Sequence, residues 1–132
     1  MEGRSESGIV FLDTHIVVWL YASDSSRLSS RALDLIEEND LFVSPMVELE
    51  LQYLYEIGRI IKTPEEVLQE LSYSIGLQVA DSSLKKLIKT AKTLTWTRDP
   101  FDKMITAEAM LSDSYLISVD NKIRENYEKC IS

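Results

Sequence analysis

Four acidic residues, Asp13, Glu50, Asp102 and Asp120, are far apart in the sequence but have related surroundings. Asp13 and Asp120 each come directly after a short apolar run that is typical of a buried strand. Glu50 and Asp102 lie near the starts of predicted helices. In a parallel sheet with helical connections, ligands bind outside the carboxyl ends of the strands. We therefore expect the four carboxylates to converge at one edge of such a sheet.

These acids predict a site for a divalent cation. Carboxylates held close together repel one another, and Mg²⁺ or Mn²⁺ offsets the repulsion through coordination by hard oxygen ligands. Two such ions about 3.5–4 Å apart can activate water and stabilise the leaving oxygen in phosphodiester hydrolysis. The sequence has no nucleophilic serine elbow and no glycine-rich phosphate loop, and His15 is its single histidine. A zinc site built from histidines and a Ser-His triad are therefore excluded.

Each acid also has a purely structural interpretation. Asp99 is a natural N-cap before Pro100, and Asp102 in the first helical turn favours the positive end of the helix dipole. Asp13 can simply begin a turn, and Glu50 can be a solvated helix residue. Only the shared location at strand ends and adjoining helix starts favours a function.

Strand-like and helix-like segments alternate along almost the whole sequence. We expect strands at residues 9–12, 41–43, 77–80 and 115–119, with a short last strand at Cys130. This alternation predicts an α/β fold, in which helices cover both faces of a parallel sheet of four to five strands.

Short polar residues indicate where several helices begin. Such residues, placed before an amphipathic segment, accept hydrogen bonds from the first free N–H groups of the helix. We expect caps at Ser29 or Ser30, at Thr63, and at Asp81 or Ser82.

The composition predicts one compact, soluble domain. The chain has 132 residues, of which 45% are hydrophobic, and we expect a single domain over residues 8–132 after a disordered tail at residues 1–7. No apolar run approaches the roughly 20 residues that span a bilayer, and no signal-peptide pattern begins the sequence. With the single cysteine Cys130, these features predict a cytoplasmic protein that does not contact a membrane.

The net charge of −8 opposes a simple nucleic-acid-binding module, because the field of the protein repels phosphates. Cations bound at clustered carboxylates can neutralise this field locally. For basic residues near the acids, such as Arg124, we favour solvated surface over phosphate contacts. For Trp19 and the other aromatic residues of the predicted helices, we favour core or interface roles over base stacking.

The segments that carry the acids resemble the successive motifs of PIN-domain ribonucleases, especially the VapC-like toxins of toxin–antitoxin pairs. The resemblance covers residues 11–15, 43–50, 99–109 and 116–120. Its most specific part is Asp99-Pro100-Phe101-Asp102, followed by Lys103 and an alanine-rich helix. The resemblance implies a three-layer α/β/α fold, Mg²⁺- or Mn²⁺-dependent endoribonuclease activity on RNA, frequent homodimers and, for toxins, an antitoxin partner.

The resemblance also implies roles for single residues. By motif match, the metal-binding and catalytic positions fall on Asp13, Glu50, Asp102 and Asp120. Asp99 is a candidate fifth acid, and Thr14 and Ser118 match hydroxyl positions that support the site. Ahead of the second acid this sequence departs from the family pattern, so a register shifted by two residues would put Glu48 in place of Glu50.

Two other functions stay open. A phosphoacceptor signalling domain also gathers acids and Mg²⁺ at the carboxyl end of a parallel sheet. It should have an acidic pair after the first strand, where Asp13 is unpaired, and an acceptor after a middle strand, where only Asp81 follows. A catalytically silent PIN-like scaffold that binds a protein is the second alternative, which the presence of all four acids disfavours.

Overall fold

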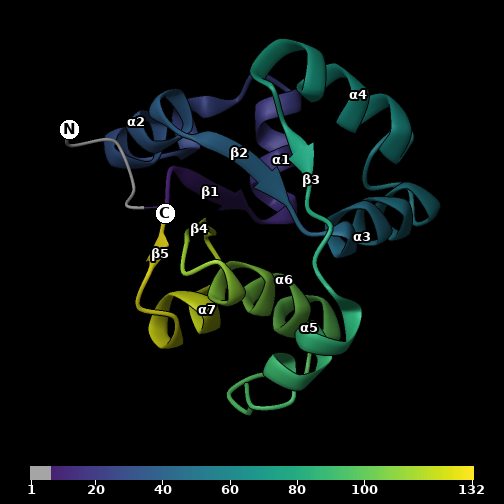
Figure 1. Ribbon diagram of the computed structural model, residues 1–132. Helices are drawn as coiled ribbons and strands as arrows, with labels where there is room; N and C mark the ends of the chain where they lie inside the picture. Colours follow the sequence, from purple (N-terminus) through teal and green to yellow (C-terminus); the bar gives the residue numbers. More distant parts are fainter. Residues whose placement is uncertain (1–6) are drawn as a thin grey trace.

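Five parallel strands form the centre of the molecule in a computed structural model, which describes residues 7–132 (Figure 1). Across the sheet the order is β3 (Gln78–Val79), β2 (Asp40–Val43), β1 (Ile9–Leu12), β4 (Tyr115–Ile117) and β5 (Cys130–Ile131). The predicted parallel sheet is therefore confirmed. Of the tail expected at residues 1–7, residues 1–6 lie outside the described part of the chain.

The central strand β1 pairs with β2 on one side and with β4 on the other. Such a strand is buried on both faces, which explains its continuous apolar sequence. From β1 the chain builds β2 and β3 in one direction and then returns to add β4 and β5 in the other. The direction changes between β1 and β4, and parallel sheets form a ligand-binding crevice at such a point.

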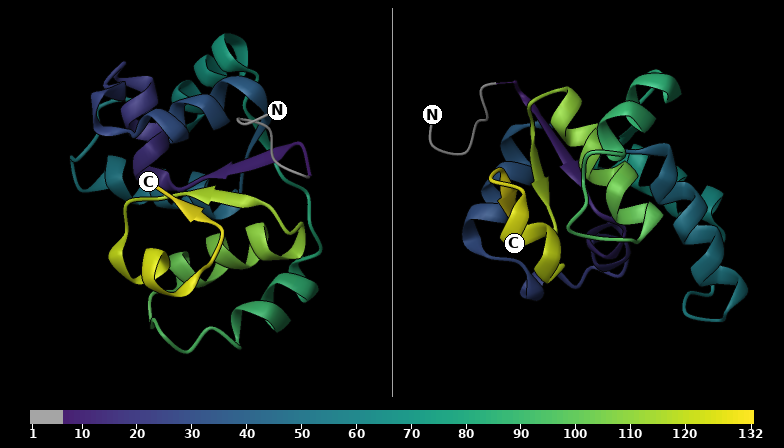
Figure 2. Two further views of the ribbon diagram at one scale, coloured as in Figure 1. Left: turned by 90° about the vertical axis from the view of Figure 1, so that its left-hand side faces the viewer. Right: turned by 90° about the horizontal axis from the view of Figure 1, so that it is seen from below.

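The helices form two layers, one on each face of the sheet (Figure 2). One layer contains α1 (Thr14–Tyr21), α2 (Ser30–Glu38), α3 (Pro45–Glu56) and α4 (Pro64–Ile75), with a short 3₁₀ helix at Ser25–Arg27. The other layer contains α5 (Leu84–Ala91), α6 (Pro100–Leu111) and α7 (Asn121–Asn126). The fold is therefore the expected three-layer α/β/α arrangement.

The core lies where the helix layers meet the sheet. Its fully buried side chains include Leu12 and Leu116 from the strands and Ile16, Leu51 and Ile105 from the helices. Burial of each such side chain stabilises the fold by roughly 1.5–3 kcal/mol. A smaller apolar cluster fills the space between α5 and α6. Within residues 7–132 no helix combines the length and apolar character needed to cross a bilayer.

The observed caps confirm two predictions and correct a third. Ser29 caps α2 by accepting a hydrogen bond from the Ala32 N–H at 3.1 Å, and Thr63 caps α4. The expected cap at Asp81 or Ser82 is wrong, because Ser83 caps α5. Three polar residues in a row make the choice ambiguous in the sequence. In the structure the Ser83 hydroxyl accepts a hydrogen bond from the Lys86 N–H, and the helix begins directly after Ser83.

Two further differences concern short elements. Strands β3 and β4 are shorter than the predicted runs at residues 77–80 and 115–119. Helix α7 was not predicted, because its six residues contain one buried side chain, Ile123, and so give no apolar period. Both differences arise in short segments, in which few residues show the apolar periodicity that predicts a helix or a strand.

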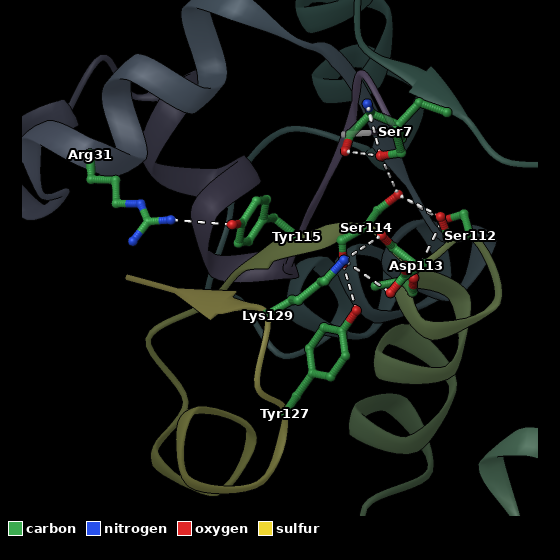
Figure 3. Close-up of polar contacts among 10 residues, drawn as sticks. Ser7, Arg31, Ser112, Asp113, Ser114, Tyr115, Tyr127 and Lys129 are labelled. Carbon is green, nitrogen blue, oxygen red and sulfur yellow. Dashed lines mark hydrogen bonds and ion pairs between the residues drawn. The ribbon is translucent and has the colours of Figure 1, made fainter. Parts of the chain in front are cut away.

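Polar contacts connect segments of the chain that lie next to the amino ends of β1 and β4 (Figure 3). The hydroxyl oxygens of Ser7 and Ser114 are 3.0 Å apart, and the Tyr127 hydroxyl donates to the Ser114 carbonyl at 2.5 Å. Lys129 forms an ion pair of 3.0 Å with Asp113. These contacts connect the segments before β1, β4 and β5 at the amino ends of the strands. The acids lie at the opposite, carboxyl ends.

Candidate active site

A cavity of about 320 Å³ lies at the carboxyl ends of β1 and β4. Five carboxylates line it: Asp13, Glu50, Asp99, Asp102 and Asp120. These are the four predicted acids and the candidate fifth, from four separate regions of the sequence. The crevice between β1 and β4 therefore gathers them, as expected for parallel strands.

Asp13 is the most firmly held of these acids. It caps α1, where Oδ1 accepts a hydrogen bond from the Thr14 N–H at 2.8 Å, and Oδ2 accepts one from the Ser118 hydroxyl at 2.6 Å. Its own N–H donates to the Ile117 carbonyl of β4 at 3.0 Å. Burial raises the pKa of Asp13, and the hydrogen bonds from Ser118 and Thr14 oppose this rise. The carboxylate is therefore fixed at the switch point of the sheet.

Glu50 enters the cavity from α3. Its Oε1 accepts a hydrogen bond from the Thr14 hydroxyl at 2.5 Å, so the two predicted supporting hydroxyls, on Thr14 and Ser118, both contact acids. Burial raises the pKa of Glu50, with smaller contributions from the charges of Asp13 and Asp99, while the Thr14 hydrogen bond lowers it. The alternative residue Glu48 is exposed and lines a different recess, between α3 and the start of α4.

The two acids of α6 differ in their surroundings. Asp99 is the N-cap, and its Oδ1 accepts hydrogen bonds from the N–H groups of Phe101 at 2.8 Å and Asp102 at 3.4 Å. Asp99 therefore caps α6 and lines the cavity at the same time. Among residues 7–132 no group donates a hydrogen bond to the Asp102 side chain. Burial, followed by the charges of Asp99 and the other three acids, raises the pKa of Asp102 to about 7.

Asp120 follows β4 and caps α7. Its Oδ1 accepts a hydrogen bond from the Ile123 N–H at 3.0 Å. Its own N–H donates to the Ser118 hydroxyl oxygen at 3.1 Å. Ser118 is fully buried and therefore connects two acids, donating to Asp13 and accepting from Asp120.

Comparison with known protein families identifies the family of this chain. Residues 10–129 match the family model of the PIN domain. The chain belongs to the PIN-domain family. The resemblance seen in the sequence is thereby confirmed over nearly the whole chain.

Two solved structures share the fold of this PIN domain over nearly its full length. One is the crystal structure of VapBC2 from Rickettsia felis bound to a DNA fragment from their promoter, with 20% identity, a TM-score of 0.66, and coverage of 94% of this chain and 97% of that chain. The other is a toxin–antitoxin complex from Klebsiella pneumoniae, with 16% identity, a TM-score of 0.68, and coverage of 93% and 96%. A comparison with curated proteins found no match. At these identities the similarity shows a common fold.

The donor set of this PIN domain suits a hard divalent cation. It consists of carboxylates, and the Asp102 carboxylate has four acidic neighbours and no hydrogen-bond donor within residues 7–132. In the same part of the chain, no three His, Cys, Asp or Glu side chains are grouped tightly enough to hold an ion as they stand. Mg²⁺ usually binds through one or two carboxylates and keeps several water ligands, so this donor set still fits such an ion.

Three other residues line the cavity but were not predicted as site residues from the sequence: His15, Trp19 and Val119. His15 and Trp19 are four residues apart on α1, which puts them on one face of the helix. That spacing, starting two residues after Asp13, was the available signal. Asp81, the residue that a phosphoacceptor domain would need, is exposed and does not line the cavity.

Proposed function

We propose that this PIN-domain protein is an endoribonuclease that hydrolyses RNA phosphodiester bonds with Mg²⁺ or Mn²⁺. The observation that carries the proposal is the convergence of five carboxylates on one cavity at the crevice between β1 and β4. Family membership supports nuclease chemistry. The sequence resemblance implies that the substrate is RNA and that it is cleaved at internal phosphodiester bonds.

The acids have distinct tasks in this proposal. Asp13, Glu50, Asp102 and Asp120 would hold the ion, which when bound supplies charge stabilisation and a more acidic water. Ser118 and Thr14 orient the carboxylates of Asp13 and Glu50 through their hydroxyl groups. Asp99 keeps the start of α6 in position through its two N–H contacts.

Among the described residues 7–132, none that lines the cavity is a serine, cysteine or lysine. The carboxylates are proposed to hold the ion, so the proposed reaction is direct attack by water on the scissile phosphate, in line with the leaving oxygen, without a covalent enzyme intermediate. Positioning and electrostatic stabilisation supply the catalysis.

Cleavage of a labelled RNA tests this function. We expect the wild type to cut RNA with Mg²⁺ or Mn²⁺ but not with EDTA, and Asp13→Asn to lose at least 100-fold in rate. Removal of one group that stabilises a transition state often costs about 10²–10³. Asp81→Asn is the matched control, because Asp81 is an exposed acid outside the cavity. Equal cleavage by the wild type and Asp13→Asn would remove the central claim.

We further propose that the nuclease is the toxin of a toxin–antitoxin pair and acts in the cytoplasm. The two solved structures described above are complexes, one named VapBC2 and the other a toxin–antitoxin complex. Expression with the product of an adjacent small reading frame should yield a complex whose RNA cleavage is inhibited. The sequence resemblance also implies a homodimer, for which light scattering should give about twice the 15.1 kDa chain mass.

A further inference from the structure

Two ring side chains of α1, His15 and Trp19, share the cavity with the five acids. Ile16 and Val17 of the same helix are fully buried in the core, so α1 presents one face to the core and His15 and Trp19 to the cavity. A site for Mg²⁺ or Mn²⁺ needs oxygen ligands and gains nothing from an indole ring. The metal chemistry therefore leaves Trp19 unexplained.

The surroundings of Trp19 hold its ring at the wall of the cavity. Trp19 is half-buried and packs against the main core. The Arg27 guanidinium lies over the ring, 5.1 Å from its centroid, and Arg27 is itself held by a 2.9 Å ion pair with Asp24. Arg27 therefore covers one face of the ring and core contacts limit its motion, so a base would contact the part of the ring that lines the cavity, at a reduced entropic cost.

We propose that Trp19 is a stacking platform for a nucleobase of single-stranded RNA next to the scissile phosphate. This inference rests on the proposed ribonuclease function and adds a base-binding subsite to it. Unstacked RNA bases commonly pack on aromatic side chains, and such stacking tolerates any base because every base has a π-face.

Because the protein is negatively charged, a contact that does not depend on charge would help it to bind RNA. A net charge of −8 and five cavity acids offer little attraction to the RNA backbone beyond the bound cations. Stacking is insensitive to that repulsion and lies within the same cavity as the acids. Trp19 thus supplies binding affinity, while the acids supply the chemistry.

Fluorescence tests the contact directly, because the chain has only two tryptophans, Trp19 and Trp96. In a Trp96→Phe protein that also carries Asp102→Asn to prevent cleavage, Trp19 is the sole tryptophan. We expect a ten-nucleotide single-stranded RNA to quench its emission saturably in the presence of Mg²⁺. The same oligonucleotide without bases should bind at least about 5-fold more weakly. Equal binding and quenching by the two oligonucleotides would overturn the proposal.

Steady-state cleavage separates stacking from a merely structural role. Trp19→Leu should raise KM by about 5- to 100-fold with little change in kcat, and Trp19→Phe should retain most of the affinity. Tyr73→Leu is the matched control, because Tyr73 is 89% exposed on α4 and outside the cavity. Cleavage by Trp19→Leu with the KM of the wild type would refute the subsite and leave the ribonuclease function standing. A wild type that neither binds nor cleaves RNA would refute both.

Discussion

The Ser118 hydroxyl donates a 2.6 Å hydrogen bond to Oδ2 of Asp13, although 105 positions separate the two residues in the sequence. The same hydroxyl oxygen accepts a hydrogen bond from the Asp120 N–H. One buried serine therefore connects the carboxyl ends of β1 and β4, where the chain changes direction across the sheet. Ser118 therefore helps to orient the Asp13 carboxylate and fixes the backbone at Asp120.

Ser118→Ala should destabilise the protein and weaken metal binding together. The substitution leaves the buried Asp13 carboxylate without one donor, which costs about 1–3 kcal/mol. It also removes an interaction that lowers the pKa of Asp13, so that protons compete more strongly with a cation. Urea denaturation and Mn²⁺ calorimetry measure the two effects. Ser82→Ala, at an exposed serine, is the control, and equal Mn²⁺ affinity in both variants would contradict the argument.

The free energy of unfolding of the metal-free protein should fall as the pH rises from about 4 to about 7. Folding raises the pKa of Asp102 from 3.8 to about 7 through burial and the neighbouring acids. In this window the folded state keeps a proton that the unfolded state has released, so rising pH favours unfolding. Urea denaturation in EDTA at pH 4.5 and 7.5 measures the slope. Asp102→Asn should flatten it, and an unchanged slope would refute the assignment.

Mn²⁺ should reverse this pH trend. A cation that binds the deprotonated cluster stabilises the folded state, by about 4 kcal/mol at a thousand times the dissociation constant. The rise in unfolding temperature should therefore be larger at pH 8 than at pH 5. Asp81→Asn should respond like the wild type. No shift with millimolar Mn²⁺ would instead favour a catalytically silent PIN-domain scaffold.

Tyr127→Phe should lower stability without changing the specific activity. The Tyr127 hydroxyl donates to the Ser114 carbonyl at 2.5 Å, and burial raises the pKa of Tyr127 to about 12. Loss of this hydrogen bond costs about 1 kcal/mol, which urea denaturation resolves. The contact lies next to the amino ends of β4 and β5, whereas the acids lie at the carboxyl ends of β1 and β4, so RNA cleavage per folded molecule should not change. Tyr73→Phe, at an exposed tyrosine, should change the free energy of unfolding by less than about 0.5 kcal/mol.

The parallel sheet and the acids at its strand ends could be predicted from the sequence, because this prediction does not require the order of the strands. Apolar runs followed by Asp13 and Asp120 fix which ends of β1 and β4 carry carboxylates, whatever the order of the strands. The resemblance to PIN domains supplied the acids on the helices. Residue type alone does not tell a site acid from a capping acid, because Asp99 caps α6 and lines the cavity at the same time.

Helix rotation and the cavity wall were harder to predict. Val47, Leu51 and Leu54 form the buried stripe of α3, whereas Leu49 is 54% exposed, so hydrophobicity alone does not say which side faces the sheet. Trp19 was expected in a core or interface, and it does pack against the core while lining the cavity. Only tertiary structure shows that one indole ring has both environments.

The corrected cap of α5 gives a test of local structure. Ser83→Ala should cost about 0.5–1 kcal/mol, because the Ser83 hydroxyl accepts from the Lys86 N–H at 3.4 Å. Asp81→Ala and Ser82→Ala should each stay within about 0.5 kcal/mol of the wild type. Urea denaturation of the three variants compares them directly. A larger loss in Ser82→Ala than in Ser83→Ala would restore the cap first expected from the sequence.

The choice between Glu50 and Glu48 can be decided with two isosteric variants. Glu50 lies three residues after Val47 and four before Leu54, on the side of α3 that faces the sheet, and it lines the cavity, whereas Glu48 is exposed. Glu50→Gln removes a proposed metal ligand and should lower Mn²⁺-dependent RNA cleavage by at least 100-fold, in the range of about 10²–10³ for one stabilising group. Glu48→Gln changes the net charge by the same amount but should cleave at nearly the wild-type rate. If Glu48→Gln lost activity and Glu50→Gln kept it, the sequence register shifted by two residues would be the correct one.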